Sequence, residues 1–83
     1  MTQTGDVVLY TKERDCAPCV EAKKFLAAHQ IAYVEKDVAN RDYLMELVKQ
    51  YKLMTVPVLV VNDMPLVGFD REQYEKALGL WGA

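Results

Sequence analysis

The chain lacks the uninterrupted apolar run of about 18 residues that marks a membrane-spanning helix. It also lacks a leader in which basic residues precede a short apolar stretch, so we expect no secretion signal and a cytoplasmic location. Ten Lys and Arg residues against 12 Asp and Glu residues give a formal net charge of −2. Because the charges are of mixed sign, the composition provides no basic surface for nucleic acid or for a membrane.

Cysteine and histidine are scarce, with two cysteines and one histidine in the chain. Cys16 and Cys19 are separated only by Ala17 and Pro18. A structural zinc site takes four ligands, which one copy of this chain cannot supply, although two copies could share a metal through four cysteines. A structural disulfide over so short a loop would add little stability. In a reducing compartment a C-x-x-C pair is usually reduced and reactive, which favours redox chemistry.

No repeat, linker or low-complexity segment divides the sequence, and 83 residues suit one domain. Hydrophobic residues make up 52% of the chain, which is enough for a core. A domain of this size buries only about 60% of the surface that its unfolded chain exposes, so we expect its free energy of unfolding to be small. We therefore expect one domain over residues 1–83, and we expect it to be a monomer.

The periodicity of apolar residues predicts seven elements. Strands are predicted over residues 6–11, 31–37, 58–61 and 64–67, and helices over residues 17–29, 41–51 and 71–78. The order βαβαββα predicts an α/β fold in which the first two strands are parallel. Pro65 cannot donate to a neighbouring strand, so the fourth strand is expected at a sheet edge.

Turn and cap residues mark the boundaries of these elements. Asn40 is the expected N-cap of the second helix. Asp70 with Gln73 predicts an N-cap and capping box for the third helix, and Gly79 is expected to end it. The pair Asn62-Asp63 suits a tight hairpin turn between the last two strands.

The cysteine pair lies where the first strand gives way to the first helix. If Cys16 is the N-cap, Pro18 falls in the first turn, where a missing N–H costs nothing. Cys19 then falls at the third helical position, whose N–H normally donates to the N-cap side chain. A Cys16 thiolate can accept that bond, and the helix dipole favours its charge. Positions three apart also face each other, so Cys19 can close a disulfide with Cys16.

Four short stretches together resemble the sequence motifs of glutaredoxins and small glutaredoxin-like redoxins. In chain order they are Tyr10-Thr11-Lys12, Cys16-Ala17-Pro18-Cys19, Thr55-Val56-Pro57 and Val67-Gly68-Phe69-Asp70. The resemblance covers nearly the whole chain. It implies a thioredoxin fold, with a four-stranded mixed sheet and three helices in the order βαβαββα.

The resemblance also implies roles for these residues. Cys16 would attack a substrate disulfide or a glutathionyl mixed disulfide, and Cys19 would resolve the mixed disulfide. Pro57 would be a cis-proline beside the active site, where Val56 offers its backbone N–H and C=O to the substrate backbone. Four further residues occupy places similar to those that hold the carboxylates of glutathione in glutaredoxins: Lys12, Gly68, Phe69 and Asp70. No bound cofactor is implied, and glutathione would act as a reductant.

The sequence departs from the glutaredoxin pattern in three places. Pro18 stands where glutaredoxins usually have tyrosine, as in the C-G-P-C of thioredoxins. Val67 stands where many glutaredoxins have the first of two glycines, and one extra residue lies between Lys12 and Cys16. The single G-F-D segment also resembles NrdH-redoxins, which are reduced by thioredoxin reductase and donate to ribonucleotide reductase. Their usual W-S-G-F-R-P segment is not matched.

Two classes of function follow from these patterns. The first is a dithiol oxidoreductase that reduces protein disulfides or mixed disulfides, with glutathione or a flavoprotein thioredoxin reductase as its electron source. The second is a non-catalytic module in which two copies of the chain bind one metal ion through their four cysteines. The first is favoured because Pro57 and the segment Gly68-Phe69-Asp70 have no role in the second. Since Asp15 works against a Cys16 thiolate, we expect a reduction potential closer to that of thioredoxin than to that of glutaredoxins.

Overall fold

Seven elements follow in the predicted order βαβαββα in the computed structural model, which describes residues 7–80. They are β1 (Val7–Thr11), α1 (Ala17–Ala28), β2 (Val34–Asp37), α2 (Arg41–Tyr51), β3 (Val58–Val61), β4 (Met64–Val67) and α3 (Arg71–Ala77). The predicted thioredoxin fold, a four-stranded mixed sheet with three helices, is confirmed. The predicted first residue of the first strand, Asp6, lies outside the described residues.

The strands lie side by side in the order β2-β1-β3-β4. β1 and β2 are parallel, as predicted for two strands joined through a helix, and the other two pairs are antiparallel. Asn62 and Asp63 join β3 to β4 with φ angles of 51° and 68°, which a tight hairpin turn requires. Pro65 lies in the edge strand β4, as its missing N–H predicts.

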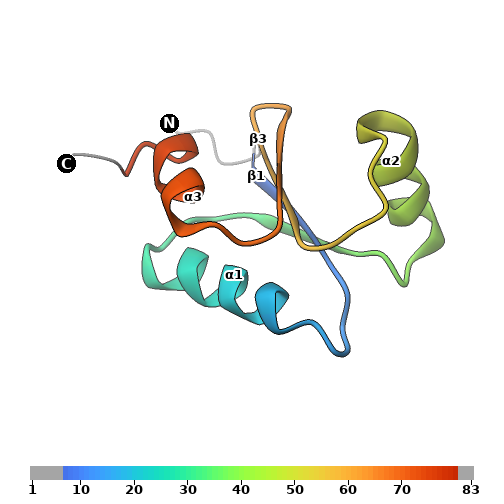
Figure 1. The fold of residues 1–83 in the computed structure, drawn as a ribbon, viewed down its shortest axis with the longest axis horizontal. Coiled ribbons are helices and arrows are strands. Elements are labelled where there is room, and N and C mark those ends of the chain that lie inside the picture. The colour runs from blue at the N-terminus through green and yellow to red at the C-terminus, as the bar shows by residue number, and fades with distance from the viewer. Residues whose placement is uncertain (1–6, 81–83) are drawn as a thin grey trace.

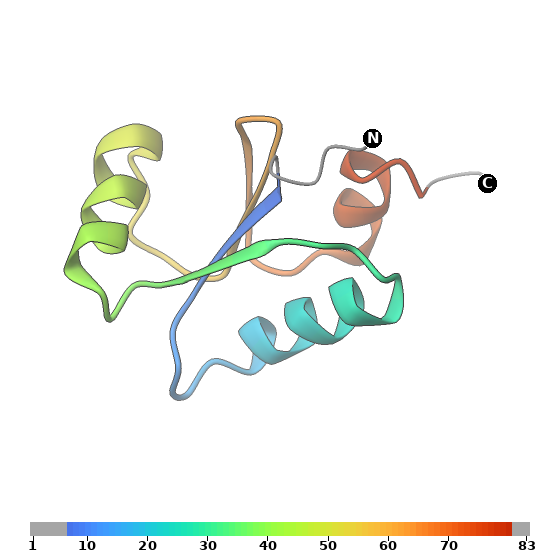
Figure 2. The ribbon, with the colours of Figure 1, turned by 180° about the vertical axis from the view of Figure 1, so that it is seen from behind.

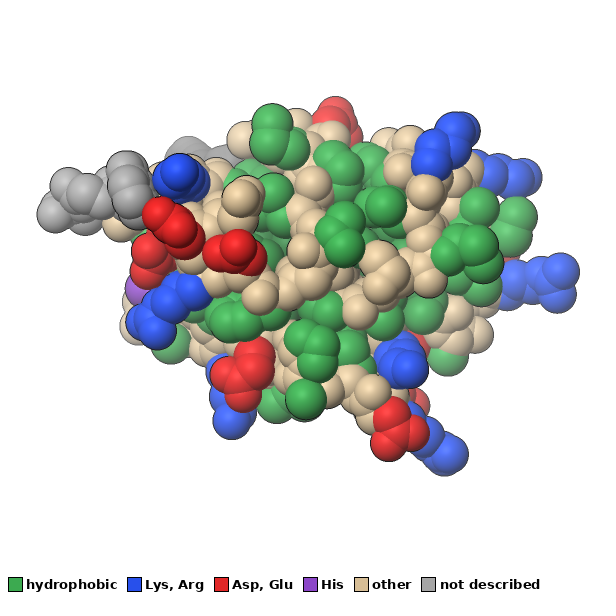
Figure 3. Space-filling view, in the orientation of Figure 1, with side chains coloured by type: hydrophobic (Ala, Val, Ile, Leu, Met, Phe, Trp, Pro, Cys, Tyr) green, Lys and Arg blue, Asp and Glu red, His purple; other side chains and the backbone are tan. Residues whose placement is uncertain are grey.

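Helices cover both faces of the sheet, with α1 and α3 on one side and α2 on the other (Figures 1 and 2). Successive side chains of a strand point to opposite faces, so β1 and β3 contribute to two cores. The core under α1 and α3 contains Val7, Leu9, Ala22, Phe25, Leu26, Leu59, Val61 and Tyr74. The core under α2 contains Tyr10, Leu47, Val58 and Val60. In the space-filling view, hydrophobic side chains lie mainly toward the middle of the face and most charged ones at its margin (Figure 3).

The junction of α1 and β2 differs from the prediction. β2 begins at Val34 rather than at Ile31, and α1 ends at Ala28 with the exposed His29 as its C-cap. The Ile31 N–H donates to the Leu26 carbonyl at 2.9 Å, which closes the end of the helix. Because its N–H is used in this way, Ile31 packs against the core under α1 instead of joining the sheet.

A polar network holds α2 against the sheet. The Glu46 carboxylate accepts hydrogen bonds from Lys36 Nζ of β2 and from the Tyr10 hydroxyl of β1, each at 2.6 Å. The bonds from Lys36 and Tyr10 lower the pKa of Glu46. Burial, and then the Glu46 carboxylate, raise the pKa of Tyr10, so Tyr10 remains a donor at neutral pH. The network therefore fixes the position of α2 relative to β1 and β2.

Replacing Glu46 with Gln is expected to lower the free energy of unfolding at pH 7 by on the order of 1 kcal/mol. Because the folded-state pKa of Glu46 is lowered, its contribution is present above its ordinary pKa of 4.5 and is lost as the pH falls through the folded-state value. Urea unfolding at several pH values should show the gap between wild type and variant closing below about pH 4.5.

Glu21→Gln provides the control, because the pair between Glu21 and Lys24 is long, at 4.0 Å, and well exposed. That variant should change stability little at any pH. A gap for Glu46→Gln that stayed constant down to about pH 3 would contradict the assignment of the network.

Candidate active site

The loop after β1 carries the cysteine pair to the start of α1. Thr11 is fully buried at the end of β1, whereas residues 12–15 are exposed. Asp15 has a φ of 53°, in the left-handed region that Asp tolerates better than most residues. The chain then turns back so that Cys16, with a φ of −132°, becomes the N-cap of α1.

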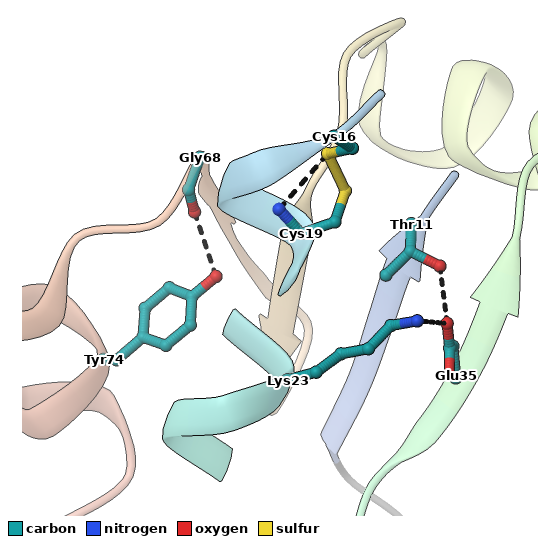
Figure 4. Close-up of a disulfide and its surroundings, with 7 residues drawn as sticks. All are labelled: Thr11, Cys16, Cys19, Lys23, Glu35, Gly68 and Tyr74. Atoms are coloured by element: carbon teal, nitrogen blue, oxygen red, sulfur yellow. Dashed lines mark hydrogen bonds and ion pairs between the residues drawn. A yellow bond between two sulfur atoms is a disulfide. The ribbon is translucent and has the colours of Figure 1, made fainter. Parts of the chain in front are cut away.

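The predicted cysteine cap is present. The backbone N–H of Cys19 donates to the Sγ of Cys16 at 3.2 Å (Figure 4). Pro18 lies in the first turn, where its missing N–H leaves no helical bond unmade. The Val20 N–H donates to the Cys16 carbonyl at 3.2 Å, which closes that turn. The positive end of the helix dipole is therefore directed at the sulfur of Cys16.

The two cysteines form a disulfide in this structure, with an S–S distance of 2.09 Å and a Cα–Cα distance of 5.2 Å. Cys16 is partly exposed, whereas Cys19 is only 1% exposed. An external thiol or disulfide can therefore reach the sulfur of Cys16 but not that of Cys19. Cys19 is placed to react with Cys16 alone.

A second polar network, which the sequence did not reveal, ties the middle of α1 to the sheet (Figure 4). Oε2 of Glu35 accepts a hydrogen bond from the Thr11 hydroxyl at 2.8 Å and pairs with Lys23 Nζ at 2.7 Å. Burial raises the pKa of Glu35, but the bonds from Lys23 and Thr11 outweigh it and leave the pKa lowered. The three residues belong to three different elements, so no local pattern in the sequence could have joined them.

A pocket of about 330 Å³ opens beside Cys16. Apolar side chains and two opposite charges line it: Lys12, Asp15, Cys16, Pro18, Val38, Leu44, Leu47, Met54, Thr55 and Val56. Three of the predicted site residues, Lys12, Cys16 and Val56, thus meet at one pocket. Leu44 and Leu47 come from α2, so the network that fixes α2 also fixes one wall of this pocket.

Pro57 follows the pocket residue Val56 and is buried. The Val56–Pro57 peptide bond is cis, as the resemblance implied. The Pro57 carbonyl accepts a hydrogen bond from the Gly68 N–H at 2.8 Å. Gly68 has a φ of 78°, and its own carbonyl accepts from the Tyr74 hydroxyl at 2.9 Å (Figure 4). Gly68 is thereby held between Pro57 and the buried Tyr74.

Phe69 and Asp70 have structural contacts of their own away from the pocket beside Cys16. The ring of Phe69 packs edge-on against Phe25 and Tyr74, with centroid distances of 5.9 and 5.1 Å. Oδ1 of Asp70 accepts from the backbone N–H groups of Glu72 and Gln73 at 3.1 and 3.2 Å, so Asp70 is the N-cap of α3 as predicted. Of the four predicted glutathione-binding residues, Lys12 therefore lines the pocket beside Cys16, whereas Gly68, Phe69 and Asp70 are not part of that lining.

Within residues 7–80 there is no cluster of three or more His, Cys, Asp or Glu side chains that could hold a metal ion. In the same residues, no helix has the length and apolar character needed to span a membrane.

Residues 7–65 match the family model described as glutaredoxin. The chain is 29% identical over 70 residues to the glutaredoxin-like protein NrdH of Lactococcus lactis subsp. cremoris strain MG1363. The aligned residues cover 84% of this chain and 96% of that protein. The same protein of Lactococcus lactis subsp. lactis strain IL1403 matches equally well.

Solved structures with the same fold include the thioredoxin-like protein BC3987, at 30% identity and a TM-score of 0.81. That similarity covers 86% of this chain and 97% of the other. A glutaredoxin from Archaeoglobus fulgidus has a TM-score of 0.79 at 16% identity, with coverage of 89% and 86%, and so supports the fold alone.

In the reduced protein, iodoacetamide is expected to alkylate Cys16 well before Cys19. Cys16 is partly exposed and its sulfur faces a helix N-terminus, whereas Cys19 is buried. Brief labelling followed by peptide mass mapping measures the order, and labelling in denaturant, where both thiols react, is the control. Preferential labelling of Cys19 in the folded protein would contradict the geometry.

Proposed function

Because the chain belongs to the glutaredoxin family, we propose that it is a dithiol thiol–disulfide oxidoreductase that reduces protein disulfides or mixed disulfides. One observation carries the proposal. A partly exposed Cys16 caps α1 and is already joined to a buried Cys19. In this arrangement a substrate can reach the sulfur of Cys16, and the buried sulfur of Cys19 can then attack Cys16 and release the substrate.

The reaction uses the reduced pair and proceeds in two exchanges. The Cys16 thiolate attacks one sulfur of the substrate disulfide, which forms a mixed disulfide and releases the first substrate thiolate. The Cys19 thiolate then attacks the sulfur of Cys16, which forms the Cys16–Cys19 disulfide and releases the second substrate thiolate. The two protons lost by the cysteines balance those gained by the substrate thiols, and two electrons pass to the substrate.

We assign substrate contacts to the residues around the pocket. Among residues 7–80, no hydrogen bond uses the backbone N–H or C=O of Val56, so both are available to a substrate backbone. Lys12 supplies a positive charge to the same pocket. Pro57 and Gly68 support the Val56 segment through their mutual hydrogen bond, whereas Phe69 and Asp70 act by holding the start of α3.

We extend the proposal to the electron source. Among residues 7–80, Lys12 is the one cation in the lining of the pocket beside Cys16, and the Asp70 carboxylate caps α3, which supports a site with few groups for the two carboxylates of glutathione. A flavoprotein thioredoxin reductase is therefore the reductant that we favour over glutathione. The similarity to NrdH of Lactococcus lactis supports a second candidate, a redoxin of the NrdH type that donates to ribonucleotide reductase.

Single cysteine substitutions test the proposed roles. Cys19→Ser should accumulate a mixed disulfide between Cys16 and a substrate, because the resolving thiol is gone, and should lose dithiol activity. Cys16→Ser should lose all disulfide reductase activity and form no such adduct. Non-reducing mass spectrometry with an insulin reduction assay measures both, and substantial activity in Cys16→Ser would show that the roles are wrong.

The reduction potential is expected to lie below the glutaredoxin range of about −200 to −230 mV and nearer to the thioredoxin value of about −270 mV. Asp15 lines the same pocket as Cys16 and opposes its thiolate, and Pro18 provides no N–H to the first turn. Both features disfavour the reduced state. Equilibration in glutathione buffers with thiol trapping measures the potential, and a value above about −220 mV would contradict this argument.

A further inference from the structure

Met54 lies on the segment that joins α2 to β3, and it lines the pocket beside Cys16. Its side chain is 81% exposed, the largest fraction among the exposed large hydrophobic side chains of residues 7–80. Leu53 before it and Val56 after it pack against the core under α2. Because the segment is anchored on both sides of Met54, the fold itself keeps this thioether in solvent beside the reactive cysteine pair.

The disulfide makes Met54 the sulfur at this site that an oxidant can still attack. Peroxides oxidise cysteine through its thiolate. Cys16 and Cys19 are joined in the structure, so neither sulfur can react as a thiolate. The thioether of Met54 has no such protection, and an exposed methionine is readily converted to methionine sulfoxide.

We propose that Met54 is a modification site at which hydrogen peroxide forms methionine sulfoxide, and that this sulfoxide slows the reduction of protein disulfides. The inference rests on the proposed function, because a protein substrate that reaches Cys16 comes against Met54 in the same pocket lining. One oxygen of the peroxide is transferred to the sulfur of Met54 as the O–O bond breaks. The sulfur loses two electrons, and the other oxygen leaves as water with both protons.

The sulfoxide changes the surface that a docked substrate covers. Oxidation converts a flexible apolar side chain into a polar one. A protein that docks over Met54 would take the sulfoxide oxygen out of water, which costs free energy unless the protein supplies a donor. A small disulfide covers less of Met54, so its reaction with Cys16 should change less.

Limited treatment of the disulfide form with hydrogen peroxide tests the proposal, because the cysteines are protected in that form. After the peroxide is removed with catalase, peptide mass mapping should find sulfoxide at Met54 before Met64 and Met45, which are 61% and 37% exposed. The protein is then reduced and assayed. The rate of insulin reduction should fall by at least about fivefold, the effect of roughly 1 kcal/mol of lost docking. The rate for bis(2-hydroxyethyl) disulfide should fall by less than about twofold.

Two matched variants connect the loss of activity to one sulfur. Met54→Leu keeps an apolar side chain of similar size but has no thioether. Each variant is compared with itself before and after peroxide, so any change in its starting rate cancels. Peroxide should leave the rate of Met54→Leu unchanged, whereas Met64→Leu should lose as much as the wild type, because Met64 lies on β4 and is not part of the pocket lining. Methionine sulfoxide reductases should restore the rate of the treated wild type.

The outcomes separate the inference from the proposed function. Full conversion of Met54 with an unchanged rate of insulin reduction would overturn the inference and leave the oxidoreductase intact. So would oxidation of Met64 ahead of Met54, a loss of activity that persisted in Met54→Leu, or an equal loss for insulin and the small disulfide. If the untreated protein reduced no disulfide at all, the proposed function itself would fail, and the inference with it.

Discussion

The hydrogen bond from the Cys19 N–H to the sulfur of Cys16 is the contact on which the rest of the site depends. It starts α1 at a cysteine instead of at the usual hydroxyl or carboxylate cap. One bond therefore fixes the register of the helix, directs the helix dipole at a reactive atom and keeps the two sulfurs facing each other. The strongly buried β1 holds this junction in place, because its side chains are packed from both faces of the sheet.

The two faces of the sheet support the site in different ways. On one face, Thr11, Glu35 and Lys23 attach the middle of α1 to β1 and β2. On the other, the contacts of Glu46 with Tyr10 and Lys36 set the position of α2. The pocket lies where the loop after β1 meets α2, so its shape depends on both networks. Apolar packing builds the scaffold, and a few polar contacts between distant segments place its parts.

The sequence predicted what depends on short-range chemistry. The order of elements follows from the periodicity of apolar residues along each segment. The cap at Cys16, the edge position of Pro65 and the end of α3 at Gly79 each follow from one residue and its neighbours. The start of β2 was predicted wrongly at Ile31, and the strand begins at Val34. Ile31 has a high preference for strands, but its N–H closes the end of α1 and its side chain packs against a core.

The polar networks and the pocket could not be predicted from the sequence, because they join residues that are distant in the chain. Tyr10 and Glu46, for example, are 36 positions apart, and only the folded chain brings them together. The same holds for the predicted glutathione-binding residues. The sequence predicted these residues from their order alone, and the fold places Lys12 at the pocket and uses Asp70 to cap α3, so their binding of glutathione stays a prediction.

Pro65 has a consequence for the behaviour of this protein in a crowded solution. An edge strand presents a row of unpaired donors and acceptors, which can template pairing with another chain and lead to fibrous aggregates. β4 carries the exposed apolar side chains Met64 and Val67, so it would otherwise be an attractive template. Because the proline between them has no N–H, the row of donors along β4 is interrupted, and this edge of the sheet is a poorer template for a further strand.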